Sequence, residues 1–205
     1  FAFSEQGAMK NCPIRFDTGF NVVFAGNLGT VQSLETILDS AKILQNETDI
    51  TIYLVGSGSR SDWLRSEISH RNLVNVKLPG RFPLSIMPTI LSRASALLVS
   101  LVRSPVMSQT VPSKVQAYLA AGRPIIAALD GEGARIISQA AAGIASPAED
   151  ASRLADAILL LKRSSAEELS RMGNSARAFY EANFEPRLLA VRLKQLLIEI
   201  QRESR

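Results

Sequence analysis

The stretch TVPSKVQAYLAAGRPIIAALDGE, from Thr110 to Glu132, combines a helix start, a small-residue helix and a short apolar strand. Pro112 suits the first turn of that helix, Thr110 or a neighbour suits its cap, and Gly122 suits its end. The apolar run at residues 124–129 is typical of a strand buried in a parallel sheet. A helix followed at once by such a strand predicts one unit of an α/β fold.

Further apolar runs alternate with helical periodicity along the rest of the chain. Helices are expected between the strands and over most of the chain after Asp150. Short connections between alternating strands and helices predict an α/β fold: a Rossmann-like parallel sheet of about six strands, with helices on both faces and a C-terminal helical tail. The other predicted strands cover residues 20–26, 50–56, 74–80, 94–101 and 142–146.

The loops that follow the strands hold the candidate site residues, because open parallel sheets bind ligands at the carboxyl ends of their strands. The first such loop carries Gly26, Asn27 and Gly29, and the second carries Gly56 and Gly58. Glycine lets the backbone turn sharply and approach a ligand closely. Neither loop matches the G-x-G-x-x-G fingerprint or a P-loop. Each is therefore open to two interpretations, a tight turn or a ligand contact.

Lys114 stands in the first turn of the helix after Pro112, where the helix dipole is already positive. Alone, that position costs up to about 1 kcal/mol. A bound anion would reverse the sign of this cost, because the backbone amides and the ammonium would both face it. The alternative is a Lys114 side chain that extends into solvent. Glu132 is similarly open: it either pairs with a helix dipole or accepts hydrogen bonds from sugar hydroxyls.

Composition argues against several classes of protein. The 205 residues carry a formal charge of +4, but the Lys and Arg are scattered and aromatic content is 6%, which does not favour nucleic acid binding. One cysteine, Cys12, and one histidine, His70, provide neither a disulfide framework, a Cys/His zinc cluster nor a Ser-His-Asp triad. The sequence shows neither a P-loop lysine nor an Mg²⁺-binding aspartate pair, so phosphoryl transfer is poorly supported. The remaining chemistry is the binding of an anion and a polyol.

Six segments, in this order, resemble the carboxy-terminal domain of a GT-B glycosyltransferase of family 4. The resemblance runs from about Phe20 to Phe184. Within the family, the segments most resemble bacterial O-antigen and surface-polysaccharide transferases, including N-acetyl-L-fucosamine transferases. The segments are VVFAGNLG…QSLETILDSA, IYLVGSGSRSDWL, NVKLPGRFP, SALLVSL, VPSKVQAYLAAGRPIIAALDGEGARII and MGNSARAFYEANF.

The resemblance implies one half of a retaining, metal-independent enzyme without a cofactor. Residues 20–185 would bind a nucleotide diphosphate sugar, with uridine as the base by analogy, and residues 186–205 would form a C-terminal helix. Residues 1–19, which lack an initiating Met, would lead from an amino-terminal domain of the same protein that binds a lipid-linked glycan acceptor. The protein is expected in the cytoplasm, where the inner face of the cytoplasmic membrane would present the acceptor.

Carried onto this sequence, the resemblance assigns the diphosphate to Lys114 and to the amides after Pro112. The predicted donor-binding residues are Gly26, Asn27, Gly29, Gly56, Gly58, Arg81, Arg103, Thr110, Pro112, Ser113, Lys114 and Glu132.

The sequence departs from the family at two glutamates that usually lie eight positions apart. These positions hold Gln109 and Ala117. Gln109, which with Lys114 forms the predicted catalytic pair, can hydrogen-bond a donor sugar but cannot stabilise a cation by charge. Glu132 is the expected replacement for the missing ribose contact.

A second departure concerns the basic residues that the family often places after the first strand. They appear here as Asn27 and Gln32, which leaves more of the diphosphate to Lys114, helped by Arg103.

Two other functions compete with glycosyl transfer, an epimerase and a non-catalytic module. A sugar-nucleotide epimerase would need acidic or histidine groups at the cleft, and too few are found. A non-catalytic binding or scaffold module is favoured by the missing glutamates. Apolar residues of the last predicted helix are expected in a core or against another domain, with membrane contact as the alternative; they are Leu188, Val191, Leu196 and Ile200.

Overall fold

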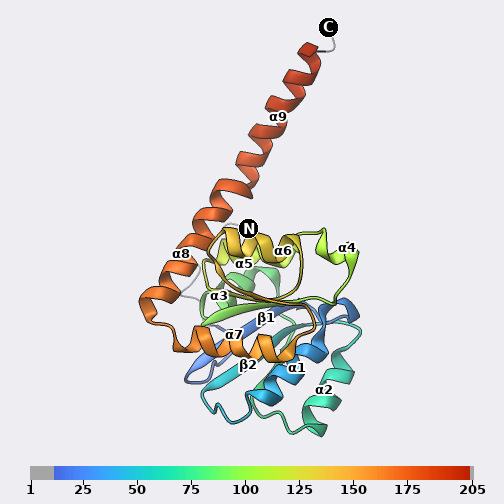
Figure 1. Cartoon of the computed structure of the whole chain (residues 1–205), viewed down its shortest axis with the longest axis vertical. Coiled ribbons are helices and arrows are strands. Elements are labelled where there is room, and N and C mark those ends of the chain that lie inside the picture. Colours follow the sequence, from blue (N-terminus) through green and yellow to red (C-terminus); the bar gives the residue numbers. More distant parts are fainter. Residues whose placement is uncertain (1–11, 204–205) are drawn as a thin grey trace.

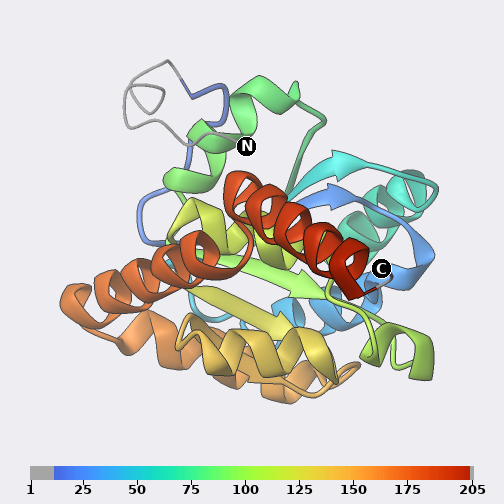
Figure 2. The ribbon, with the colours of Figure 1, turned by 90° about the horizontal axis from the view of Figure 1, so that it is seen from above.

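The computed structural model describes residues 12–203, which form a six-stranded parallel sheet with helices on both faces (Figures 1 and 2). The strand order is β3-β2-β1-β4-β5-β6, the arrangement of a doubly wound sheet. The predicted fold class is confirmed. The strands are β1 (Phe20–Asn27), β2 (Ile50–Ser57), β3 (Val76–Gly80), β4 (Ala96–Ser100), β5 (Ile125–Ala128) and β6 (Gly143–Ser146).

Helices connect the strands and form the C-terminal tail. The short helix α4 was not predicted from the sequence. The α-helices of the described residues are α1 (Leu34–Ile43), α2 (Ser61–His70), α3 (Met87–Ser92), α4 (Pro105–Ser108), α5 (Ser113–Ala121), α6 (Glu132–Gln139), α7 (Ala151–Arg163), α8 (Ala166–Asn183) and α9 (Pro186–Glu203). Two 3-10 turns, η2 (Thr30–Gln32) and η3 (Leu84–Ile86), precede α1 and α3.

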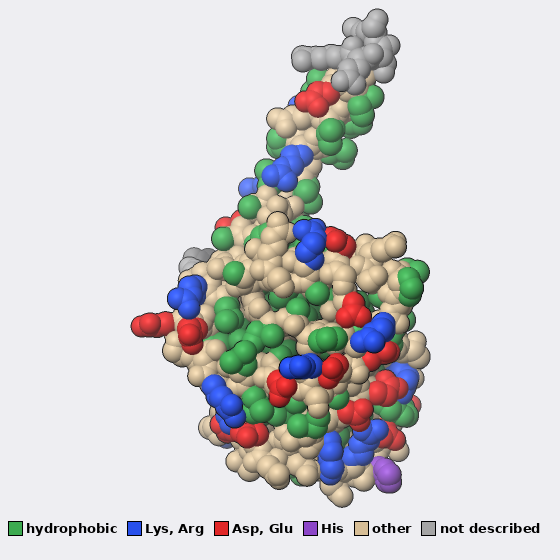
Figure 3. Space-filling view, in the orientation of Figure 1, with side chains coloured by type: hydrophobic (Ala, Val, Ile, Leu, Met, Phe, Trp, Pro, Cys, Tyr) green, Lys and Arg blue, Asp and Glu red, His purple; other side chains and the backbone are tan. Residues whose placement is uncertain are grey.

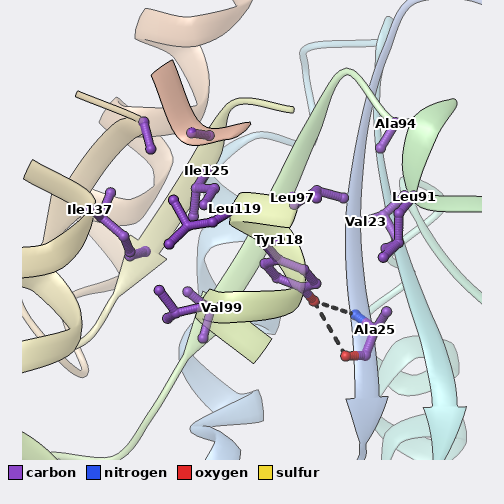
Figure 4. Close-up of a cluster of buried hydrophobic side chains, with 14 of the residues drawn as sticks. Val23, Ala25, Leu91, Ala94, Leu97, Val99, Tyr118, Leu119, Ile125 and Ile137 are labelled. Atoms are coloured by element: carbon purple, nitrogen blue, oxygen red, sulfur yellow. Dashed lines mark hydrogen bonds between the residues drawn. The ribbon is translucent and has the colours of Figure 1, made fainter. Parts of the chain in front are cut away.

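Each face of the sheet has its own hydrophobic core. Val23 and Ala25 of β1 pack with residues of α3, α5, α6 and α8, and Figure 4 shows part of this cluster. Val22 and Phe24, which alternate with them along the strand, pack with residues of α1, α2 and α7. Burial on both faces explains why the strands read as continuous apolar runs in the sequence.

The order of the strands reverses between β1 and β4. β1 pairs with β2 along its whole length, from Phe20 with Ile50 to Asn27 with Ser57. Its pairing with β4 is limited to Val22 and Val23. The two central strands therefore separate toward their carboxyl ends, which opens the crevice where such sheets bind ligands.

Tyr118 of α5 occupies the gap between the separated strands. Its hydroxyl accepts a hydrogen bond from the Ala25 amide (2.8 Å) and donates one to the Ala25 carbonyl (3.3 Å), as Figure 4 shows. Burial raises the pKa of the Tyr118 hydroxyl, so it stays protonated and can donate. The Tyr118 hydroxyl thus supplies the hydrogen-bond partner for the Ala25 backbone that β4 does not supply at this position.

We expect Tyr118→Phe to lower the free energy of unfolding by about 1–3 kcal/mol, because it leaves the buried Ala25 amide without an acceptor. Denaturant titration of the variant and the wild type measures this difference. Equal stabilities would contradict the assigned role of the hydroxyl.

Several boundary predictions are wrong, and β4, for example, begins at Ala96 rather than at residue 94. β3 begins at Val76 rather than at residue 74, and Val74 is 81% exposed. α5 begins after Pro112, which is its N-cap, and no side chain caps this end. The hydroxyl of Thr110, the predicted cap, instead donates to the Met107 carbonyl (3.0 Å) in the preceding turn.

Helix α9 projects away from the rest of the described chain (Figure 1), and apolar side chains are visible along it in Figure 3. Of the residues predicted for a core or docking role, Val191 and Leu196 each have 55% of their surface exposed. The predicted alternative of a core position is therefore wrong for these residues of the helix. Within residues 12–203, no helix combines the length and the apolar character needed to cross a membrane.

The domain boundaries at residues 19–20 and 185–186 stay predictions, and residues 1–11 of the first predicted segment lie outside the described residues.

Candidate functional site

A cavity of about 540 Å³ lies at the carboxyl ends of β1 and β2. It is lined by six of the predicted donor-binding residues, which come from four different parts of the chain. They are Gly26, Asn27, Gly56, Gly58, Arg81 and Lys114. The topology therefore brings the two glycine loops, the turn after β3 and the start of α5 to one place.

The two glycine loops pack directly against each other. A Cβ atom at Gly56, where φ is +144°, would lie 1.8 Å from the Gly26 carbonyl oxygen. A Cβ atom at Gly58 would lie 2.4 Å from the Leu28 carbonyl oxygen. The Ser61 hydroxyl, at the start of α2, also bonds the Gly58 amide (2.9 Å) and carbonyl (2.8 Å). These glycines are therefore required by backbone packing at the mouth of the cavity, whether or not a ligand binds.

We expect Gly56→Ala to destabilise the fold by about 1–3 kcal/mol, through left-handed strain and the clash with Gly26. Gly80→Ala is the matched control, since its φ is +91° but a Cβ atom there meets no atom within 4 Å. Thermal unfolding of both variants separates the clash from the strain. A Gly56→Ala loss no larger than that of Gly80→Ala would contradict the packing argument.

Lys114 reaches across the carboxyl end of β1 from one face of the sheet toward the other. A Cβ atom at Gly26 would lie 2.6 Å from Lys114 Cε, so only glycine leaves room for the lysine stem. The Nζ atom lies 3.7 Å from the centroid of the Phe24 ring and donates a hydrogen bond to Gln32 Oε1. Phe24 belongs to the core on the opposite face from α5. The alternative in which Lys114 extends into solvent is therefore wrong.

Burial lowers the pKa of the Lys114 ammonium to about 7, and no acidic group contributes to this shift. The ion pairs formed within residues 12–203 do not include Lys114. A bound anion would favour the charged form and raise this pKa toward its ordinary value. The site thus holds a positive group for which no described side chain supplies an opposite charge.

The remaining wall of the cavity is apolar and comes mainly from the segment between β3 and the end of α3. A flat, partly apolar group can pack against such a wall while Lys114 faces a charged group at the other end. The apolar residues of this wall, which were not predicted from the sequence, are Phe82, Leu84, Met87, Pro88 and Leu91, with Val55 of β2 and Ala117 of α5.

The other predicted site residues do not line this cavity. Pro112 and Ser113 form the start of α5, next to Lys114. Gly29 lies beside the Asn27 side chain in the β1–α1 loop. Gln109 is exposed at the end of α4, and Thr110 follows it.

Arg103 and Glu132 have partners of their own. Arg103 pairs with Asp130 (3.3 Å) and donates to the Ala148 carbonyl (2.9 Å). Glu132, in the first turn of α6, pairs with Arg135 (2.7 Å), whose guanidinium lowers the pKa of that carboxyl. Glu132 therefore lies at the helix start, as one interpretation predicted, and its carboxylate is paired within α6. Its contact with a ribose stays a prediction.

Within the described part of the chain, no three His, Cys, Asp or Glu side chains come together as they would around a metal ion.

The fold and the crevice define one Rossmann-like half of a GT-B fold. HepE from Anabaena, solved in complex with UDP, superposes with a TM-score of 0.77 at 16% identity, over 89% of this chain and 49% of HepE. The C-terminal domain of LpcC, a glycosyl transferase group 1 family protein from Francisella tularensis, superposes with a TM-score of 0.66 at 12% identity, over 82% of this chain and 88% of that domain.

Residues 19–163 match the family described as glycosyl transferases group 1, and the chain belongs to that family. It is also 28% identical over 166 residues to a probable glycosyltransferase, WbjE, from Pseudomonas aeruginosa. This match covers 78% of the chain and 40% of WbjE. The chain therefore spans less than half the length of that relative.

Proposed function

We propose that this chain is the donor-binding half of a glycosyltransferase that transfers a sugar from a nucleotide diphosphate sugar. The observation that carries the proposal is the Lys114 ammonium, which lies without an acidic partner at the start of α5 and beside a largely apolar cavity. The nucleoside would pack against the apolar wall, and the diphosphate would face Lys114 and the first amides of α5. Membership of glycosyl transferases group 1 supports this assignment.

The same groups would assist the reaction. When the bond between sugar and diphosphate breaks, negative charge develops on the departing diphosphate. An ammonium and helix amides already oriented toward it stabilise that charge without a rearrangement of solvent. In this proposal Lys114 takes the electrostatic role of a metal ion, the enzyme is metal-independent, and the sugar is transferred with retention of configuration. Gln109 would hydrogen-bond the donor sugar.

Uridine is the proposed base. HepE was solved with UDP and with UDP-glucose, and this chain shares its fold. The proposed acceptor is a growing, lipid-linked polysaccharide of the O-antigen type, for which the resemblance of the sequence segments to bacterial O-antigen and surface-polysaccharide transferases is the support. The finer proposal is a family 4 enzyme related to N-acetyl-L-fucosamine transferases. It would work at the inner face of the cytoplasmic membrane, with an amino-terminal acceptor-binding domain in the same protein.

A non-catalytic nucleotide-sugar-binding module is the second candidate. It is favoured because the residues that line the cavity include no Asp or Glu, and because Ala117 stands in its wall where the family usually has a glutamate. Both candidates bind the nucleotide. Sugar transfer by the whole protein separates them.

Calorimetric titration with UDP, GDP and ADP, each with and without EDTA, tests the proposal. We expect saturable binding of UDP that EDTA leaves unchanged, with weaker binding of the two purine nucleotides. Binding that EDTA abolishes would contradict the metal-independent site. No binding of any of the three would contradict the proposed function.

A further inference from the structure

The hydrogen bond between Lys114 and Gln32 joins two segments that are 82 residues apart in the chain. Gln32 ends the 3-10 turn η2, and only 9% of the residue is exposed. From the sequence, Gln32 stands out only as a position where the family often has a basic residue. In the structure its amide oxygen accepts the hydrogen bond from the Lys114 ammonium.

The backbone around Gln32 is fixed from the neighbouring strand. The Gln32 carbonyl accepts a hydrogen bond from the hydroxyl of Ser100 (2.6 Å), a fully buried residue at the end of β4. The Val31 carbonyl accepts one from the Val102 amide (3.0 Å), just after β4. The loop after β1 is thus joined to the end of β4, across the place where the two strands separate. These bonds set the position from which Gln32 meets Lys114.

The chemistry of the Gln32 side chain matters because of its charge. An amide oxygen accepts a hydrogen bond from an ammonium but carries no net charge. A carboxylate of the same size would form an ion pair and neutralise much of the charge that a ligand anion needs. The Phe24 ring, the other group against Nζ, attracts the cation through its face and is likewise uncharged. Lys114 is therefore held by two groups that leave its charge unopposed.

We propose that Gln32 is a positioning residue that holds the Lys114 ammonium at the switch point through an uncharged hydrogen bond, so that the charge stays available to a ligand diphosphate. This inference rests on the proposed function, since it concerns the same site. Gln32 would thus affect the attraction between Lys114 and the ligand diphosphate without touching the ligand itself.

The test compares UDP affinity in the wild type, Gln32→Glu and Gln32→Met between pH 7.5 and 9.5. Gln32→Glu keeps the size of the side chain and adds a charge, and we expect it to weaken UDP binding about 10-fold or more at pH 7.5. The new carboxylate should also raise the pKa of Lys114. The loss of affinity that the wild type shows with rising pH should then begin at a higher pH. The other charged or titratable side chains that line the cavity are Arg81 and Tyr118.

Gln32→Met keeps the bulk of the side chain but removes the acceptor, so it should lower the pKa of Lys114 further and weaken UDP binding throughout this pH range. Gln45→Glu, on an exposed residue beyond the far end of α1, is the matched control for net charge and should bind UDP as the wild type does. Thermal unfolding shows that each variant folds.

A residue with only a structural role would change stability without moving the pH profile. If Gln32→Glu and Gln32→Met both fold and keep the wild-type affinity and pH profile, the inference is wrong and the nucleotide site stands. If the wild type itself binds none of UDP, GDP and ADP, the proposed function fails, and this inference fails with it.

Discussion

Replacing Lys114 by methionine is expected to weaken UDP binding by about 10- to 150-fold, the equivalent of a lost charge-assisted contact of roughly 1.5–3 kcal/mol. Methionine keeps the length of the lysine stem, which crosses Gly26. The substitution therefore removes the ammonium while it preserves most of the packing. No carboxylate of the described chain pairs with Lys114, so its loss leaves no anion without a partner.

Two measurements make this result specific. Titration of Lys114→Arg, which keeps a cation, should show a smaller loss of affinity than Lys114→Met. The free energy of unfolding of Lys114→Met should stay within about 1 kcal/mol of the wild type, because the avoided desolvation of the ammonium offsets the loss of its hydrogen bond to Gln32. An unchanged dissociation constant in a folded Lys114→Met protein would show that the ligand anion does not meet this residue.

The affinity for UDP is expected to decrease by about 50- to 100-fold between pH 7.5 and 9.5. The free Lys114 ammonium has a pKa of about 7, so above that pH the empty site loses its proton. A bound diphosphate raises the pKa, so binding requires the uptake of a proton. The affinity therefore falls by up to tenfold for each unit of pH until the pKa of the bound form is reached. Calorimetry at several pH values measures this profile.

The chosen pH window keeps other titrations out of the result. The terminal phosphate of a nucleotide loses its last proton near pH 6, by analogy with a phosphoserine. Burial raises the pKa of Tyr118 out of this window. Lys114→Arg should therefore bind with an affinity that is nearly flat in pH. A wild-type profile as flat as that of Lys114→Arg would contradict the lowered pKa of Lys114.

The sequence predicts most of this fold because each element carries its own signal. The strands β1, β2, β4 and β5 are buried over most of their length and read as apolar runs, and most of the longer helices show a clear periodicity. The errors lie where such signals are weak. The first residue of the third predicted run, Val74, is exposed, and α4 has only four residues, too few to show a period.

The sequence predicts the site only in part, for a similar reason. Gly26, Gly56 and Lys114 stand in motifs that are visible along the chain. The hydrogen bond between Gln32 and Lys114 is not, because it depends on how the loop after β1 is joined to β4. Tyr118 resembles any apolar helix residue until the separation of β1 from β4 is known.

The substitutions at the family's glutamate positions also become clearer in three dimensions. Ala117 forms part of the cavity wall, whereas Gln109 is exposed at the end of α4. The cavity therefore has apolar surface at the position where the family 4 resemblance implies a glutamate, and the positive side chains in its lining are Lys114 and Arg81. Donor binding at this site should depend on positive charge and apolar packing more than on acidic contacts to sugar hydroxyls.

A crystal structure of the chain with UDP would show whether the diphosphate meets Lys114. We expect the uracil against the apolar wall near Phe82 and Met87, and a diphosphate oxygen about 2.7–2.9 Å from Lys114 Nζ, near the first amides of α5. Gln32 should remain in contact with the ammonium. A diphosphate bound away from α5, with Lys114 still held only by Gln32 and Phe24, would contradict the account.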